Sequence, residues 1–215
     1  MGYNPFSCHS NNQKGYDSTK TIEMNIIRHN KNILFIALGV GLILLNALTA
    51  MQFTEEMTWS PFDFAFAGTL LFGTGLVFEL ITRRATSTSY RAAVGIAVLA
   101  GMLLVWVNLA VGIIGSEDNP TNVLYLGVLA ILILGSLLVR FRSQGMARTM
   151  FVTALAQLVV PLVALLVWTP EFSTLDGLLE GLRVVGVTGL FVVLWAAAGV
   201  LFRQAGVRLE REGRP

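Results

Sequence analysis

The sequence predicts an all-α fold, an integral membrane bundle of six transmembrane helices arranged as three hairpins. Of its 215 residues, 54% are hydrophobic and only 13% are charged, whereas a soluble domain averages about 25% charged residues. The apolar residues are gathered into six runs, and a helix needs about 20 of them to cross the hydrocarbon core. The basic residues collect in alternate connections between these runs. Together these patterns indicate one domain that has lipid as its solvent.

The elements follow in order along the chain. Residues 1–31 form a polar cytoplasmic tail that we expect to be disordered, and Met24 is an alternative to Met1 as its start. The transmembrane domain covers 32–203, because lipid cannot satisfy free backbone groups and each apolar run must therefore be helical. Its six helices are expected at 33–53, 62–82, 92–115, 123–139, 146–168 and 178–202. A short basic cytoplasmic tail, 204–215, ends the chain.

The distribution of charge predicts the orientation. Fourteen of the fifteen basic residues lie in the two tails and in the second–third and fourth–fifth connections. The other three connections are acidic, and the remaining base, Arg183, lies just inside the sixth helix. Cytoplasmic loops of membrane proteins carry the excess of Lys and Arg. Both termini are therefore expected in the cytoplasm of a bacterial cell, and the acidic loops outside.

Two outer turns share one pattern, Pro-x-Asp/Asn-x-x-aromatic-x-Gly. It occurs at 61–68 and at 120–127. Proline stops the preceding helix, and Asp63 and Asn122 are expected to cap the helices that follow. Phe66 and Tyr125 are expected at the depth of the lipid headgroups. The shared pattern indicates turn and cap chemistry rather than a ligand site.

Two charged residues fall inside the predicted spans. Glu79 precedes Arg83 by four residues, so an ion pair with Arg83 or Arg84 is the favoured interpretation. The alternative is a proton or cation acceptor at the inner mouth of a pathway. Arg183 follows Glu180 by three residues and Asp176 by seven, which favours a charge pair tying the sixth helix to the outer turns. An anion anchor in an outward cavity is the alternative.

Three amides complete the set of intramembrane polar candidates. Asn46 and Asn108 lie in the outer halves of the first and third helices, and Gln157 precedes Pro161 by four residues. Such amides commonly form hydrogen bonds between helices, each worth about 0.6–2 kcal/mol. They are alternatively the lining of a polar cavity, in which Pro161 frees the Gln157 carbonyl. Stripes of small residues, such as Ala93, Ala97 and Gly101, predict tight packing or dimerisation.

The sequence lacks the residues that several kinds of functional site require. Cys8 is the only cysteine, and both histidines, His9 and His29, precede the first span. A haem, metal-cluster or thiolate site within the helices is therefore not expected, and no lysine is placed for a Schiff base. Walker, Rossmann and Gly-x-Ser-x-Gly motifs do not occur. We expect no cofactor, no nucleic-acid partner and no enzyme activity.

Two segments resemble those of an uncharacterised family of six-span proteobacterial inner-membrane proteins. They are 106–120 with Asn122, which reads Trp-Val-Asn-Leu-Ala-Val-Gly-Ile-Ile-Gly-Ser-Glu-Asp-Asn-Pro, and the outer loop from Phe53 to Phe64. The resemblance covers about Met24 to Arg203. It implies a bacterial inner-membrane location and six spans. It brings no substrate, cofactor or catalytic residue.

Two functions remain open from the sequence. The leading hypothesis is a non-enzymatic accessory or structural protein that associates with itself or with a larger membrane complex. The competing hypothesis is a small transporter or channel for a cation or small solute, in which Asn46, Asn108 and Gln157 line the route. An enzyme that acts on lipid is a distant third.

Overall fold

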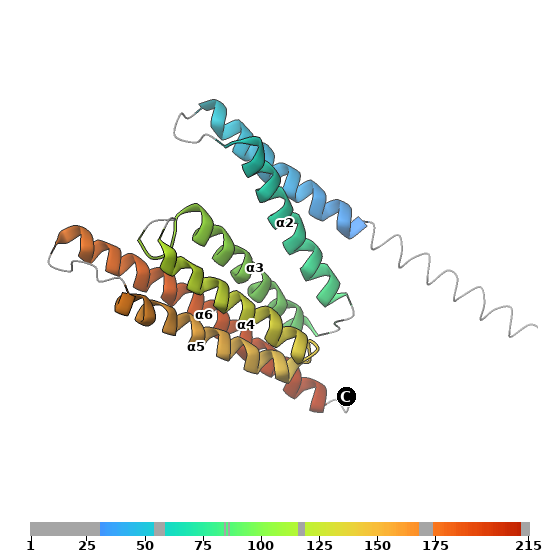
Figure 1. The fold of residues 1–215 in the computed structure, drawn as a ribbon. Helices are drawn as coiled ribbons and strands as arrows, with labels where there is room; N and C mark the ends of the chain where they lie inside the picture. The colour runs from blue at the N-terminus through green and yellow to red at the C-terminus, as the bar shows by residue number, and fades with distance from the viewer. Residues whose placement is uncertain are drawn as a thin grey trace, which may run out of the picture. The chain divides into compact units, whose positions relative to one another are not determined.

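The computed structural model describes residues 31–53, 59–83, 85, 87–115, 119–167 and 174–211, with the side chains of 165–167 and 209–210 excepted. Six helices in this part of the chain are long and apolar enough to cross a membrane (Figure 1). This confirms the predicted all-α membrane class. The chain forms two compact units, Met1–Leu76 and Val77–Pro215. They are called unit 1 and unit 2 here.

Unit 1 holds the first described helix, Lys31–Phe53, and the part of α2 (Pro61–Thr82) before Val77. The two helices approach closely at glycines of α2. A Cβ added at Gly75 would lie 2.5 Å from Ile36 Cγ2, and one at Gly68 would lie 3.3 Å from Leu44 Cδ1. These glycines therefore set the spacing of the first hairpin, as the small-residue pattern predicts.

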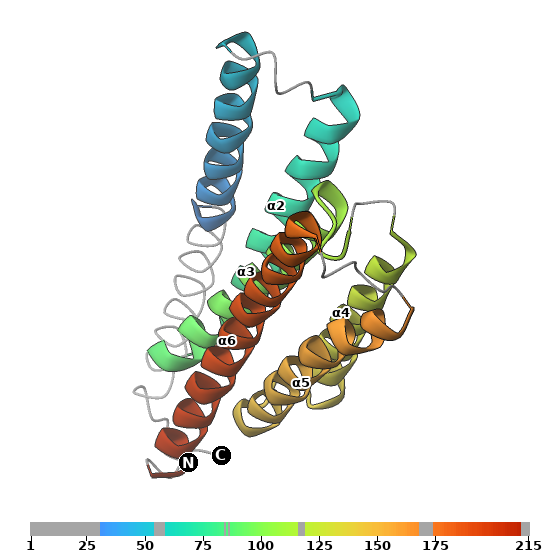
Figure 2. The same ribbon diagram turned by 90° about the vertical axis from the view of Figure 1, so that its left-hand side faces the viewer.

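Unit 2 contains the end of α2 and four further membrane helices. These are α3 (Thr88–Ala110), α4 (Leu124–Leu138), which follows the short 3₁₀ helix η1 (Pro120–Val123), α5 (Ser143–Val167) and α6 (Leu175–Arg211). α6 packs against both α5 and α3, and α5 also packs against α4 (Figure 2). The contact between α3 and α4, which follow one another in the chain, is much less extensive than these three. The third and fourth helices, predicted to form the middle hairpin, are therefore not a closely packed pair. α3 packs mainly against α6, and α4 mainly against α5.

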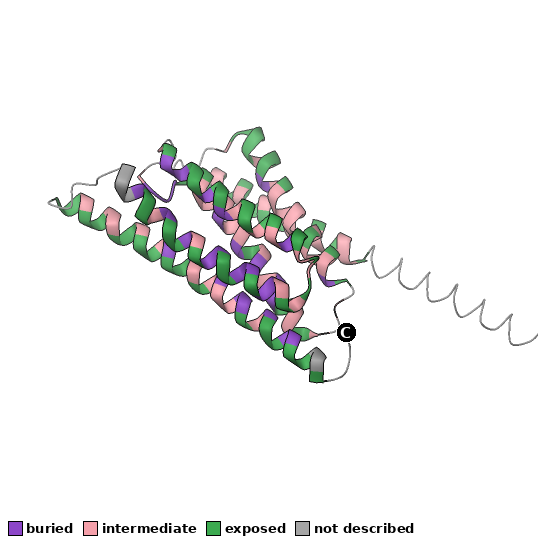
Figure 3. Cartoon of the chain, turned by 60° about the horizontal axis from the view of Figure 1, so that its bottom comes forward, coloured by how far each residue is buried: buried purple, intermediate pink, exposed green. Residues whose placement is uncertain are grey.

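The core of unit 2 is formed by α3, α4, α5 and α6 (Figure 3). Large side chains from the later helices fill it, since Trp195, Tyr125, Phe191 and Phe202 are almost completely buried. On α3, three of the five buried residues are alanines, Ala93, Ala97 and Ala100. Large residues on one helix therefore pack against small ones on another, which brings the backbones close. Leucines and valines cover the outer surfaces, as expected for contact with lipid.

The two largest differences from the predicted helix bounds are at the ends of the third and sixth helices. The third helix ends at Ala110, five residues before the predicted end, because Gly112 and Gly115 adopt φ of +71° and turn the chain. The sixth helix continues to Arg211 instead of ending near Phe202. Its extension is held by contacts with α5, where Gly206 lies against Gln144. The stretch after 203 is therefore mostly a continuation of the helix.

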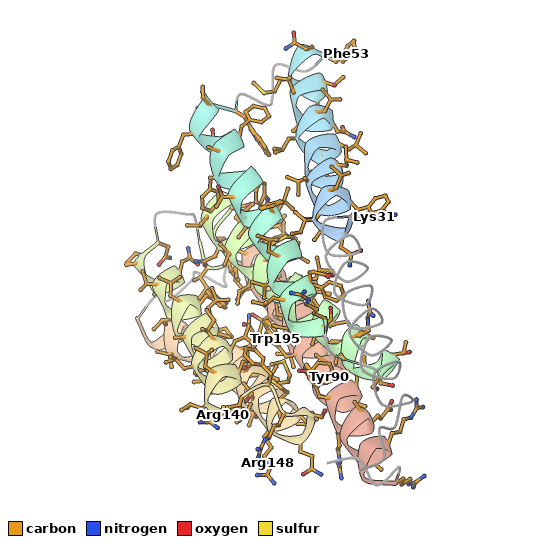
Figure 4. All side chains as sticks on the ribbon, turned by 90° about the vertical axis from the view of Figure 1, so that its right-hand side faces the viewer. Lys31, Phe53, Tyr90, Arg140, Arg148 and Trp195 are labelled. Carbon is orange, nitrogen blue, oxygen red and sulfur yellow. The ribbon has the colours of Figure 1, made fainter. Side chains whose placement is uncertain are left out.

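The turn between α4 and α5 is held in an uncommon conformation. Arg140 and Phe141 have φ of 51° and 58°, a left-handed geometry that costs about 1–3 kcal/mol per residue outside glycine. The Tyr90 hydroxyl donates a 2.8 Å hydrogen bond to the Phe141 carbonyl. The Tyr90 ring also packs edge-on against Phe202. Tyr90 of α3 thus fastens this end of unit 2, where Arg140 and Arg148 also lie (Figure 4).

Candidate functional site

Asp63 takes part in the cap of α2, in a role slightly different from the predicted one. Its carboxylate accepts hydrogen bonds from the backbone N–H (2.7 Å) and the hydroxyl (2.8 Å) of Ser60. The Ser60 hydroxyl in turn accepts a 3.3 Å bond from the Asp63 N–H. Ser60 is therefore the capping residue, and Asp63 is the third helical residue of a capping box. The sequence pattern identified the turn correctly but assigned the cap to the wrong member.

Asn122 was expected to cap the fourth helix, and this expectation is wrong. The cap belongs to Asn119, whose side chain accepts a bond from the Thr121 N–H. The Asn122 side chain is buried instead and accepts hydrogen bonds from the backbone N–H groups of Ile113 (3.1 Å) and Ile114 (3.0 Å). It also donates to the Ile114 carbonyl (3.2 Å). Asn122 thus locks the loop after α3 onto the start of η1.

Arg183 connects α6 to that same loop. Its guanidinium forms a 3.3 Å ion pair with Glu180, as the spacing predicts. It also donates a 2.6 Å hydrogen bond to the Gly115 carbonyl, 68 residues away in the chain. The second contact was not predicted, because it requires the positive φ of Gly115 and the packing of α6 on α3. Arg183 is exposed, so its charge remains largely screened.

Glu79 lies near the end of α2 and is half-buried. It has an interaction partner. The predicted pair with Arg83 or Arg84 stays a prediction, and Arg84 lies outside the described residues. The N-terminal tail with Cys8, Met24 and the histidines also lies outside them, as do most of the acidic loop residues. Among the described residues, no three His, Cys, Asp or Glu side chains come together as metal ligands.

Asn46 lies on an exposed side of the helix Lys31–Phe53, whose ends are marked in Figure 4. It belongs to a stripe with the spacing four, three, four, three, four. The stripe consists of Phe35, Gly39, Leu42, Asn46, Thr49 and Phe53. Ile36 and Leu44, which face α2, are not part of it. Nothing lies within 4 Å of a Cβ built on Gly39, and Phe35, Leu42 and Phe53 are 72%, 68% and 83% exposed.

Asn108 and Gln157 belong to a buried polar set inside unit 2. The set consists of six atoms without a hydrogen-bond partner among the described residues: Asn108 Oδ1, Tyr125 Oη, both amide atoms of Gln157, Thr188 Oγ1 and Trp195 Nε1. Tyr125, Gln157 and Trp195 are fully buried, and Thr188 nearly so. Unsatisfied buried polar groups are uncommon in folded proteins. This set is therefore the strongest candidate site in the described part of the chain.

Three members of the buried set were not predicted. Tyr125 was expected at headgroup depth; its depth stays a prediction, and its side chain is fully enclosed by the bundle. Thr188 and Trp195 lie in an apolar stretch of α6, where the sequence offers no contrast between a lipid-facing and an inward-facing position. Their separation by seven residues, two helical turns, was the available signal that they share a face.

The class of this protein follows from its helices: it is a multi-pass helical membrane protein. Its interior combines large aromatic side chains with a few uncharged polar groups. Comparisons of the chain with protein-family models, with curated proteins and with solved structures find no match. Any more specific function must therefore be argued from the geometry.

Proposed function

We propose that this protein is a non-enzymatic component of the bacterial inner membrane that associates with a second copy of itself, with both termini in the cytoplasm. The observation that carries the proposal is the exposed position of Asn46 in the stripe on the helix Lys31–Phe53. An amide that faces hydrocarbon lacks the hydrogen bonds that water would supply. A partner helix is the usual way in which such a group is satisfied.

The chemistry of Asn46 favours a second copy as the partner. An amide both donates and accepts hydrogen bonds, so two copies related by a two-fold axis satisfy each other. The spacing of the stripe is the heptad spacing of paired helices, in which a single buried Asn fixes the register. Gly39, with open space around it, permits close approach two turns from the amide. The stripe thus has the form of a homodimer interface.

Cysteine cross-linking in the native membrane tests this interface. In a Cys8→Ala background, Leu42→Cys lies within the stripe, whereas Leu48→Cys lies on another side of the same helix and is also exposed. Oxidation is expected to give a covalent dimer with Leu42→Cys and much less with Leu48→Cys. Asn46→Leu is expected to weaken dimerisation of the purified protein about 3- to 30-fold, and Asn46→Gln to retain it.

Equal cross-linking at positions 42 and 48 would contradict the proposed interface. An unchanged dimer affinity in Asn46→Leu would do so as well. Native mass spectrometry of the gently extracted protein distinguishes a homodimer from a complex with other proteins. A monomer that carries no partner would remove the accessory role itself.

A second candidate function is the passage of a small solute through unit 2. The buried polar set favours it, because these groups come from α3, α4, α5 and α6 and are buried in the interior without hydrogen-bond partners. In this function Glu79 at the end of α2 would serve the inner mouth. Binding of the solute would be the first step of this passage, and substitutions in the buried polar set would test it.

A further inference from the structure

α5 and α6 run antiparallel and touch at two places near the α4–α5 turn. A Cβ built on Gly206 of α6 would lie 3.1 Å from Gln144 Cγ of α5. A Cβ built on Gly199 would lie 3.1 Å from the ring of Phe151. The two contacts are seven residues apart on each helix, which is two helical turns. The helices therefore stay in register over this stretch.

One arginine of each helix lies between these two contacts. Arg148 follows the first contact residue of α5 by four positions and precedes the second by three. Arg203 has the same spacing from the two glycines of α6. Residues three and four apart share one side of a helix, so both arginines lie on the sides by which the helices meet. Their levels differ by one residue, about 1.5 Å.

Both arginines border the outer side of the α5–α6 interface. The inner side of this interface is filled by Met150 and Phe202, which are fully buried. Arg148 and Arg203 are exposed. They are also placed within the helices rather than in the connecting loops, where basic residues would suffice to set the orientation of the protein.

The same two arginines mark an edge of the hydrocarbon core. On α6, Arg203 is 20 residues from Arg183, and no charged residue lies between them. That length of helix is about 30 Å, which is the usual thickness of the core. On α5, the 19 positions from Arg148 to the helix end at Val167 also contain no charge. Both guanidinium groups are therefore within reach of the lipid phosphates.

Exposed apolar side chains continue from each arginine toward the membrane centre. On α5, Val152 and Leu155 follow Arg148 by four and seven residues, and both are exposed. On α6, Val200 precedes Arg203 by three residues and is exposed as well. Each arginine thus lies at the headgroup end of an apolar stripe. This arrangement suits an amphiphile that has an anionic head and hydrocarbon chains.

Neither arginine forms an ion pair with another described residue. α5 contains no Asp or Glu. On α6, the acids closest along the chain to Arg203 are Glu210, seven residues away, and Glu180, 23 residues away, which pairs with Arg183. Two guanidinium groups therefore border one interface and attract an anion. Arginine binds phosphate oxygens through paired hydrogen bonds.

We propose that the outer side of the α5–α6 interface binds an anionic phospholipid, whose phosphodiester lies between Arg148 and Arg203. Its acyl chains lie along the two apolar stripes. A zwitterionic headgroup fits less well, because it brings a cation that the arginine pair repels. Basic sites between membrane helices recognise anionic headgroups in this way. The site requires neither self-association nor the passage of a solute.

Titration of the delipidated full-length protein with lipid, followed by native mass spectrometry, tests the site. The probes are palmitoyl-oleoyl phosphatidylglycerol, which is anionic, and palmitoyl-oleoyl phosphatidylethanolamine, which has the same chains and no net charge. One phosphatidylglycerol per chain is expected to stay bound at concentrations at which phosphatidylethanolamine does not. Inorganic phosphate is expected to leave the lipid in place, because it lacks the acyl chains.

Variants connect the bound lipid to the arginine pair. Arg148→Gln and Arg203→Gln are each expected to weaken phosphatidylglycerol binding about 5- to 12-fold. Arg148→Lys keeps the charge but not the paired hydrogen bonds, so a smaller loss is expected. Arg208→Gln is the matched control. It removes the same charge from an exposed position of α6, five residues from Arg203 and therefore about 140° around the helix, and binding is expected to be unchanged.

Three results would overturn the proposal. Equal binding of the two lipids would show that the headgroup charge is not recognised. Displacement of the lipid by inorganic phosphate would identify a soluble anion as the ligand. A loss in Arg208→Gln equal to that in Arg148→Gln and Arg203→Gln, including no loss in any of them, would show that the pair forms no site of its own.

Discussion

At the scale of single residues, Asn122 shows how one amide organises a loop between membrane helices. Residues 111–115, with two positive-φ glycines, follow α3, and Ile113 and Ile114 among them are buried. Buried donors must be paired, because an unsatisfied one costs about 1–3 kcal/mol. Asn122 satisfies both N–H groups with one oxygen. The loop therefore keeps a fixed shape beneath the contact from Arg183.

Removal of this amide gives the first prediction of stability. Asn122→Ala leaves two buried donors without an acceptor, so the free energy of unfolding is expected to fall by about 2–4 kcal/mol. Asn122→Asp keeps an acceptor for the two N–H groups and loses the bond donated to the Ile114 carbonyl, so a smaller loss is expected. The measurement is reversible unfolding in mixed detergent micelles. Equal losses in the two variants would show that the acceptor is not what holds the loop.

At the scale of helices, the glycines of α6 differ in how closely their neighbours are packed. A Cβ added at Gly199 would lie 3.1 Å from the Phe151 ring and 3.3 Å from Met150 Cβ, whereas nothing lies within 4 Å of one at Gly186. Glycines on this one helix therefore lie in two different environments. Gly199 allows α5 to approach, and Gly186 is on an open side.

Two leucine variants distinguish the packed glycine from the open one. Gly199→Leu is expected to destabilise the protein by about 1–3 kcal/mol, because the added side chain forces α5 and α6 apart. Gly186→Leu is expected to be neutral or slightly stabilising, since leucine favours the helix more than glycine does. Thermal unfolding of the two variants beside the wild type measures the difference. The same loss at both positions would place the cause in the helix itself rather than in its packing.

The helices also show what the sequence could and could not predict. All six lie where the apolar runs place them, because lipid requires both length and continuous hydrophobicity. Within a run, however, lipid-facing and inward-facing positions are equally apolar, so the burial of Tyr125 and Trp195 carried no pattern. Asn108 and Gln157 were identified as polar residues in apolar surroundings. Tyr125, Thr188 and Trp195 could be identified as buried polar residues only from the packing of the helices.

At the scale of the whole molecule, the charge distribution predicts how the protein sits in its membrane. Many basic residues lie near the α4–α5 turn and near the C-terminal end of α6. Arg140, Arg148 and Arg208 are among them. α6 has 37 residues and is therefore about 55 Å long, against about 30 Å for the hydrocarbon core. Residues at both of its ends should therefore reach water.

Labelling of the two ends of α6 tests the orientation. In a Cys8→Ala background, Leu175→Cys and Gln204→Cys place single thiols at exposed positions near opposite ends of this helix. A membrane-impermeant maleimide is expected to label position 175 in intact spheroplasts and position 204 only after permeabilisation, because the basic end is retained inside. The reverse pattern would show that the termini are outside.

The length of α6 also gives the molecule a mechanical property. Arg183 joins this helix to the Gly115 carbonyl at one end, and Gly206 lies against Gln144 at the other. These two contacts are 23 residues apart, about 35 Å along an uninterrupted helix. The loop after α3 and the first turn of α5 therefore lie against opposite ends of one continuous helix, which fixes the distance between them.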